Sequence, residues 1–184
     1  MAHATMDDLQ AALPRIEAAP AEGTIRAIVV RPEKGAREMP GSNAMSLAAG
    51  MHGDHWSKGC WRETEDGAPH PDVQICLMPA RVIEAFAGPD TADWGPAGDN
   101  LFIDMDLSPG NCPPGTRLAM GSAEIVITEE PHNGCQGFID RYGRDACVFV
   151  NTGRGRDLRL RGIYGRVVRD GTVSVGDSVR KVEA

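Results

Sequence analysis

The chain has 184 residues, of which 41% are hydrophobic and 24% charged, and its formal net charge is −7. This length and composition predict a soluble globular protein with one main domain. The negative charge and an aromatic content of 5% are evidence against nucleic-acid binding, which relies on basic surface and stacking platforms. No apolar run is long enough to span a membrane, and the N-terminus lacks a basic stretch followed by an apolar one. We therefore expect a cytoplasmic protein without membrane association.

Residues 1–21 predict a helical extension. Leu9, Leu13 and Ile16 lie at roughly helical spacing, Asp7-Asp8 suits a helix N-terminus, and Pro20 lies beyond the expected end. We expect this helix to pack on the domain formed by residues 22–184.

From residue 22 onward, the chain consists mainly of short apolar runs separated by turns. Strands are expected at residues 24–31, 72–78, 101–105, 116–120, 123–128, 146–151, 166–169, 172–175 and 178–182. Helices are expected at 79–87, 134–142 and 155–163, a long surface loop at 57–71, and a hairpin at Asp170-Gly171. Many short strands, with 22 glycines and 13 prolines at the corners, predict a mainly β fold, a barrel or a sandwich with a few short helices.

The five cysteines do not form a recognisable framework. Their number is odd and they include no C-x-x-C pair, so neither a disulfide scaffold nor a thiolate zinc site is expected. Cys76 and Cys147 lie within apolar runs and are expected to be small buried hydrophobic residues. Cys60 and Cys112 lie in expected loops, which favours surface thiols without a role.

Cys135 differs from the other four cysteines in its surroundings. It follows the expected strand 123–128 in the turn Pro131-His132-Asn133-Gly134-Cys135, where Pro and Gly interrupt the strand. His132 is close enough in sequence to influence protonation of the thiol. The pattern predicts an accessible, chemically competent cysteine.

Two polar turns are weaker candidates. His52-Gly53-Asp54-His55 contains metal-binding residue types, but the spacing and the lack of a third ligand favour a turn in which Asp54 accepts backbone N–H groups and His55 reaches a ligand. Asp99-Asn100 either caps the entrance to a strand or presents hydrogen-bonding groups to a ligand, and the motif alone leaves both open.

Arginines are concentrated in the C-terminal third of a chain that is acidic overall. Most of them are expected on a solvent-exposed face, but residues 151–156 combine Arg154 with two glycines that let the backbone approach an anion. No Gly-Lys-Ser/Thr sequence is present there, which disfavours nucleotide hydrolysis.

Taken in order, these segments resemble the MOSC domain, named for the C-terminal part of molybdenum cofactor sulfurase. The resemblance covers about residues 22–182. Within the family, the chain looks similar to a short, stand-alone bacterial subgroup. The resemblance rests on Val30-Arg31-Pro32, Gly50-Met51-His52-Gly53-Asp54, Gly98-Asp99-Asn100-Leu101, the segment 114–123, Pro131-His132-Asn133-Gly134-Cys135, Arg159-Leu160-Arg161-Gly162 and Gly176-Asp177-Ser178-Val179.

The resemblance implies a closed or nearly closed β-barrel that binds the molybdenum cofactor or carries sulfur. Cys135 falls on the family's cysteine and is the expected catalytic residue and metal ligand, and Asp99 stands where the family more often has Glu. The expected cofactor-binding residues are His55, Asp99, Asn100, His132, Asn133, Arg154 and Arg161. Pyridoxal phosphate is not expected, because no lysine lies in a motif for it.

The expected partners are a small anionic cofactor and a protein that donates sulfur or electrons, and the activity is left open between an oxidoreductase and a sulfur transferase. One alternative is a non-catalytic module that binds an anion or small metabolite, with a structural Cys135. A cysteine-dependent hydrolase using His132 or His55 ranks last, because no nucleophile motif is present.

Overall fold

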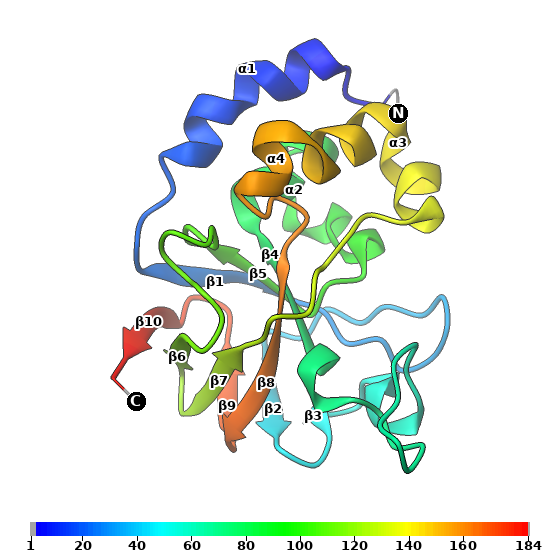
Figure 1. The fold of residues 1–184 in the computed structure, drawn as a ribbon, viewed down its shortest axis with the longest axis vertical. Helices are drawn as coiled ribbons and strands as arrows, with labels where there is room; N and C mark the ends of the chain where they lie inside the picture. Colours follow the sequence, from blue (N-terminus) through cyan, green and yellow to red (C-terminus); the bar gives the residue numbers. More distant parts are fainter. Residues whose placement is uncertain (1–2, 184) are drawn as a thin grey trace.

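Seven strands close into a barrel at the centre of the protein (Figure 1). The computed structural model describes residues 3–183. Around the barrel the order is β1-β10-β6-β7-β8-β4-β5, and β5 pairs with β1 to close it. The strands are β1 (Gly23–Ile28), β4 (Ile75–Pro79), β5 (Leu101–Asp104), β6 (Arg117–Met120), β7 (Ala123–Ile127), β8 (Ile163–Arg169) and β10 (Ser178–Val182). The expected closed β-barrel is confirmed.

A small three-stranded sheet extends one end of the barrel. It has the order β3-β2-β9 and consists of β2 (Ser42–Ser46), β3 (Gly50–Met51) and β9 (Gly171–Ser174). The expected hairpin at Asp170-Gly171 is wrong in its pairing, because β9 pairs with β2 rather than with β8. Asp170 instead accepts a hydrogen bond from the backbone N–H of Leu47 at 2.8 Å.

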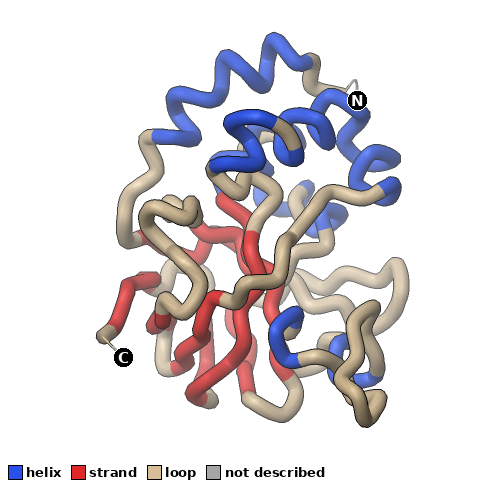
Figure 2. Tube along the Cα trace, in the orientation of Figure 1, coloured by secondary structure: helices blue, strands red, loops and turns tan. Residues whose placement is uncertain are grey.

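Helices cover the other end of the barrel (Figures 1 and 2). They are α1 (Met6–Glu17), α2 (Ala80–Ala87), α3 (Gln136–Asn151) and α4 (Gly153–Asp157). The helix expected within residues 1–21 is present as α1, and a reciprocal capping box between Thr5 and Asp8 fixes its start. Leu9 and Ile16 of α1 are buried in the helical layer.

The strand expected at 146–151 is wrong, because these residues form the second half of α3. Ala146, Phe149 and Val150 recur at helical spacing and pack into the helical layer, so tertiary packing overrides the strand propensity of the apolar run. The expected helix 155–163 is also too long, since α4 ends at Asp157 and β8 begins at Ile163.

The hydrophobic core has two main parts that the barrel wall separates, and Val73, Cys76 and Tyr164 form a small third cluster. Leu101 and Ile103 of β5 face the barrel interior, whereas Phe102 between them packs into the helical layer. Cys112 corrects the expectation of a surface thiol, because its loop folds over the barrel and buries it completely in the interior cluster. Arg159 Nη1 donates to the Cys112 carbonyl at 2.9 Å and helps to hold that loop.

Candidate functional site

A polar cavity of about 260 Å³ lies between the loop after β7, the α4 region and the start of β8. It is lined by Thr128, Glu129, Glu130, Pro131, His132, Asn133, Val150, Arg156, Arg159, Arg161, Gly162 and Ile163. Strand β7 ends at Ile127, and residues 128–133, which follow it, line the cavity. The cavity therefore brings together segments that are remote in the sequence.

Arginine side chains give this cavity, which we call the arginine cavity, an excess of positive charge. Arg156, Arg159 and Arg161 line it together with two glutamates, and Arg62 forms an ion pair with one of these, Glu130. Arg159 has a left-handed backbone with φ of 55°, which is uncommon for a residue with a side chain. Guanidinium groups in this arrangement suit phosphate or carboxylate.

Sequence reasoning did not select Arg156 and Arg159. In the sequence, these two do not differ from the other arginines that are expected on a solvent-exposed face. The signal that distinguishes these two is their spacing with Arg161 in residues 156–161, which brings all three to one cavity.

A buried ion pair lies behind the cavity wall. Arg161 Nη1 donates to both carboxylate oxygens of Asp99 at 2.9 Å, and the Asp99 side chain is fully buried. Burial raises the pKa of Asp99 above its ordinary value, although the positive charge of Arg161 opposes this shift. Arg161 Nε is buried without a hydrogen-bond partner, so this guanidinium keeps one donor unused.

His132 lies over the same ion pair. Its Nδ1 is 3.6 Å from Asp99 Oδ1 without forming a hydrogen bond, and its ring centroid lies 4.3 Å from that of Tyr164. Burial, followed by the charges of Arg161 and Arg31, lowers the pKa of His132 well below its ordinary value. The imidazole is therefore neutral near pH 7 and can either donate or accept a hydrogen bond.

Gly162 packs closely against this imidazole and against β4. A Cβ at this position would lie 3.2 Å from His132 Nδ1 and 2.1 Å from the carbonyl oxygen of Leu77, and its φ of +113° also favours glycine. Because Gly162 has no side chain, the backbone of β4 and the imidazole can pack closely on either side of it, and His132 Nδ1 is buried without a partner.

Asn100 belongs to a buried network rather than to the cavity lining. Its Oδ1 accepts hydrogen bonds from the Cys76 N–H at 3.0 Å and Arg31 Nη2 at 3.1 Å, and its Nδ2 donates to Asp54 Oδ2 at 3.0 Å. Burial alone would raise the pKa of Asp54, but the hydrogen bonds and charge of Arg31 outweigh it and hold that pKa below its ordinary value.

The turn at residues 52–55 forms as expected, with Asp54 accepting the backbone N–H groups of Arg31 and Trp56 at 3.0 Å. His55 places Nδ1 3.0 Å from the carbonyl oxygen of Arg31 and does not line the arginine cavity. Among residues 3–183, no group of three or more His, Cys, Asp or Glu side chains is placed to hold a metal ion.

Cys135 is exposed and occupies the N-cap position of α3, where its side chain makes no capping hydrogen bond. The preceding Gly134 is held by Asn151, whose Oδ1 accepts the Gly134 N–H at 3.0 Å. A methyl group placed on Gly137 would lie 3.8 Å from Cys135 Sγ and 3.3 Å from Arg141 Nη1. The thiol and a guanidinium thus flank the same small space at the start of α3.

Only some of the other expected site residues line the arginine cavity. Asn133 lines the arginine cavity with His132 and Arg161, whereas Cys135, two residues further along the loop, is not a lining residue. Arg154 lies apart from them, because its Nε forms an ion pair with Glu17 of α1 at 2.5 Å.

Three further buried donors lack partners in the described structure, namely Arg37 Nε, Arg117 Nε and the Tyr142 hydroxyl, and two of them, on Arg37 and Tyr142, lie near Asp99. Burial, followed by the negative charge of Asp99, raises the pKa of Tyr142, so the phenol keeps its proton. Arg37 Nη2 lies 3.2 Å from the position of a Cβ on Gly98, one residue before Asp99. Unused donors therefore occur near Asp99 outside the cavity as well.

Comparison with known proteins identifies the family to which the chain belongs. The family model described as MOSC domain matches residues 64–180, and the chain belongs to the MOSC domain family, which is linked in general to the molybdenum cofactor. The match begins later than the expected resemblance at residue 22. No curated protein matches the sequence significantly.

Solved structures share the fold at low sequence identity. A protein described as hypothetical has 18% identity and a TM-score of 0.59, covering 89% of this chain and 69% of that one. YuaD from Bacillus subtilis has 16% identity and a TM-score of 0.57, covering 86% and 94%. YiiM from Escherichia coli has 18% identity and a TM-score of 0.55, covering 88% and 70%. None of the helices in residues 3–183 is long and apolar enough to cross a membrane.

Proposed function

We propose that this protein binds the molybdenum cofactor, or carries sulfur for it, through Cys135. The observation that supports this most directly is an exposed thiol on the loop whose preceding residues, His132 and Asn133, line the arginine cavity. A loop that carries a soft sulfur ligand at one point and borders an anion-binding cavity at another fits a metal cofactor with a phosphate group.

The residues present fit such a group. Arg161 and His132 line the cavity, and Arg161 Nε and His132 Nδ1 are buried without partners. The cavity volume of about 260 Å³ is below the roughly 300–1,000 Å³ typical of whole-ligand pockets, so the cavity suits the anionic arm of the cofactor.

Each residue then has a separate task. The bound cofactor would supply a molybdenum centre capable of redox chemistry, and a metal held by an organic cofactor needs few protein ligands. Cys135 would provide the soft thiolate ligand, and Arg156 with Arg159 would bind phosphate oxygens. His132, neutral near pH 7, would donate or accept one hydrogen bond without adding charge.

Sulfur carriage would use the same thiol. A donor persulfide would transfer its outer sulfur to the Cys135 thiolate, so that one S–S bond breaks in the donor, another forms on Cys135, and the donor leaves as a thiolate. Exposure of Cys135 allows contact with a donor or redox partner protein. That a sulfur donor or a redox protein contacts Cys135 is part of the proposal.

A second candidate function is a non-catalytic module that binds an anion or a small anionic metabolite. The observation that favours it is that the cavity wall is complete without Cys135. In that case the arginines alone would carry the function and the thiol would have a local structural role.

Metal and pterin analysis separates the two candidates. The protein is produced in a host that makes the molybdenum cofactor, and molybdenum is measured by mass spectrometry together with pterin fluorescence after oxidation. Bound persulfide is measured on the same preparation by alkylation and peptide mass spectrometry. We expect stoichiometric molybdenum and pterin, or persulfide on Cys135.

Two substitutions with matched controls complete the test. Cys135→Ser should abolish bound molybdenum or persulfide, whereas Cys60→Ser, which changes a partly buried thiol outside the cavity, should not. Arg156→Gln should weaken pterin retention and Arg144→Gln, an exposed arginine outside the cavity, should not. Retention of cofactor at the wild-type level by Cys135→Ser would favour the anion-binding module instead.

A further inference from the structure

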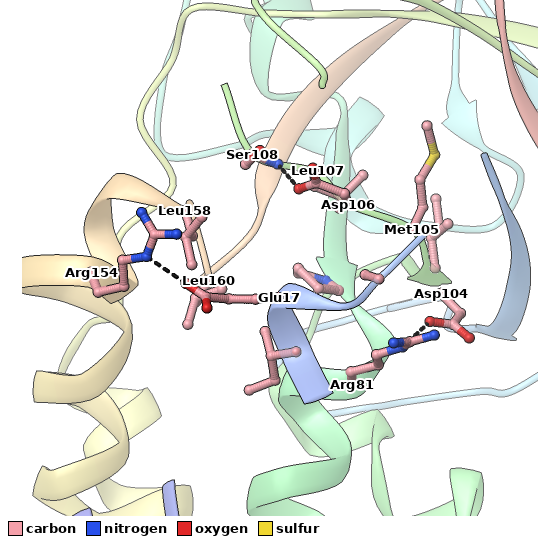
Figure 3. A pocket seen from close by; sticks show the side chains of 14 residues that line it. Glu17, Arg81, Asp104, Met105, Asp106, Leu107, Ser108, Arg154, Leu158 and Leu160 are labelled. Atoms are coloured by element: carbon pink, nitrogen blue, oxygen red, sulfur yellow. Dashed lines mark hydrogen bonds and ion pairs between the residues drawn. The ribbon is translucent and has the colours of Figure 1, made fainter. Parts of the chain in front are cut away.

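A second cavity, of about 250 Å³, is lined in part by residues that follow and belong to α4, and it shares no lining residue with the arginine cavity (Figure 3). It is bounded by the end of α1, the segment that follows β5, and residues 154–160. In Figure 3, Arg154, Leu158 and Leu160 stand on one side and Arg81 and Asp104 on the other, with Asp106 and Ser108 between them.

The two cavities share one segment but no lining residue. Along residues 154–161, Arg154, Leu158 and Leu160 line the second cavity. Arg156, Arg159 and Arg161 line the arginine cavity. The segment is therefore a wall between two separate spaces, and the second cavity is distinct from the site proposed for the cofactor.

The second cavity also uses residues outside the region that matches the family model. Ile16 and Glu17 of α1, and Ala19 just after it, contribute to the lining, whereas the family match begins at residue 64. The cavity thus depends on a helix that is additional to the matched part of the barrel.

One wall of this cavity is apolar. The hydrophobic lining residues are Ile16, Ala19, Pro79, Ile103, Met105, Leu107, Leu158 and Leu160. Ile103, Met105 and Leu107 are almost completely buried in the barrel core, so the wall they form is rigid. Such a wall removes apolar ligand surface from water and favours a ligand with a hydrocarbon body.

The charged lining residues leave one carboxylate without a cationic partner. Arg154 Nε pairs with Glu17 at 2.5 Å, and Arg81 Nε pairs with Asp104 at 2.6 Å. Asp106 accepts the Ser108 N–H at 2.9 Å, but within residues 3–183 no arginine, lysine or histidine forms an ion pair with it. Three carboxylates against two guanidiniums leave the cavity with an excess negative charge.

We propose that this second cavity is a binding site for a small organic cation with an ammonium head and a short apolar body. The ammonium group pairs with the Asp106 carboxylate, and the hydrocarbon part lies against Leu158, Leu160 and Met105. The two existing ion pairs neutralise Arg154 and Arg81, so Asp106 carries the charge that is left over in the lining. The site is independent of the function proposed for Cys135.

The test uses simple probes that separate charge from hydrophobicity. Binding of n-pentylammonium, cyclohexylammonium and benzylammonium is measured by isothermal titration calorimetry and by thermal unfolding of the full chain. Pentanoate has the same apolar body with the opposite charge, and ammonium chloride has the charge without the body. We expect saturable binding and an increased Tm with at least one organic cation, and neither with pentanoate nor with ammonium chloride.

Two variants locate the binding. Asp106→Asn keeps an oxygen that can accept the Ser108 N–H but removes the charge, and it should weaken binding by about tenfold or more. Leu158→Trp should fill the cavity and abolish binding. Asp93→Asn, an exposed aspartate that does not line this cavity, is the matched control and should bind as the wild type does.

Three outcomes would overturn the proposal. They are the absence of binding by all three organic cations at millimolar concentration, equal binding of pentanoate, or unchanged affinity in both Asp106→Asn and Leu158→Trp. Thermal unfolding without ligand shows whether each variant is folded, so a loss of affinity in a folded Asp106→Asn variant supports the site directly.

Discussion

Asp99 and Arg161, which are 62 residues apart in the chain, form an ion pair in which one guanidinium nitrogen lies 2.9 Å from both carboxylate oxygens. A second buried pair, Arg31 with Asp54, is joined to the adjacent Asn100 by hydrogen bonds. The turn at residues 99–100 therefore connects two buried ion pairs. This arrangement fixes Arg161 at the edge of the arginine cavity, so fold stability and the candidate site depend on the same contacts.

Asp99→Asn should destabilise the protein strongly. The substitution leaves the Arg161 guanidinium buried without a counter-ion, and breaking a buried pair in this way costs about 3 kcal/mol or more. Urea denaturation at pH 7 measures the loss. Asp72→Asn is the control, because it breaks a partly exposed pair with Arg166 and should cost less than about 1 kcal/mol. Equal losses in the two variants would contradict the role assigned to Asp99.

His132 should make the protein less stable as the pH falls below about 6.5. The pKa of His132 is lowered well below its ordinary value in the folded protein, so the unfolded chain binds a proton in this range and the folded protein does not. The free energy of unfolding should then decrease by up to about 1.4 kcal/mol per pH unit from this residue, down to the folded pKa. Above pH 6.5 the imidazole is neutral in both the folded and the unfolded chain, so His132 no longer lowers the free energy of unfolding.

The substitution His132→Phe tests this dependence. Phenylalanine keeps an aromatic ring against Tyr164 but cannot titrate. Urea midpoints at pH 7.5, 6.5 and 5.5 should show a shallower pH dependence in the variant than in the wild type. Parallel curves for the two proteins would mean that His132 takes up a proton in the folded state.

The sequence predicts the barrel well because its strands are short, apolar and bounded by Gly and Pro turns, which are local signals. It predicts the second half of α3 badly, because the run Ala146-Cys147-Val148-Phe149-Val150 has high strand propensity. The run is helical because of its contacts with α1 and the rest of the helical layer, which the sequence does not show. The pairing of β9 with β2 could not be predicted either, since it joins segments about 130 residues apart.

The site residues, too, are hard to predict where their contacts join segments that are far apart in the sequence. The resemblance to the family selected His132, Asn133 and Arg161, which the structure brings to one cavity. Arg154 was selected for its two flanking glycines, but its ion pair with Glu17 depends on α1, which lies 137 residues earlier in the chain. Arg31 was not selected as a site residue, because only the fold shows that Asp54 and Asn100 neutralise and bind it.

Gly162→Ala should damage both the fold and the cavity. A Cβ there would lie 2.1 Å from the carbonyl oxygen of Leu77, which cannot move without disturbing β4, and 3.2 Å from His132 Nδ1. We expect a loss of about 2 kcal/mol or more in urea denaturation, from strain and overpacking together. Gly176→Ala is the control, because Gly176 also has a positive φ, of +93°, but has open space around it. A similar loss in both variants would show that backbone strain alone, and not the clash, determines the cost.

Cysteine reactivity should follow exposure, with Cys135 the first residue to be modified. Cys135 is exposed, Cys60 is partly buried, and three thiols are buried, namely Cys76, Cys112 and Cys147. A buried thiol reacts only after local opening, so we expect labelling on the order of 100-fold slower than at Cys135. Alkylation with N-ethylmaleimide at pH 7, followed over time by peptide mass spectrometry, measures all five rates together. In 6 M urea the rates should converge. Labelling of Cys147 as fast as Cys135 in native protein would contradict the packing of α3 against the loop at Gly134.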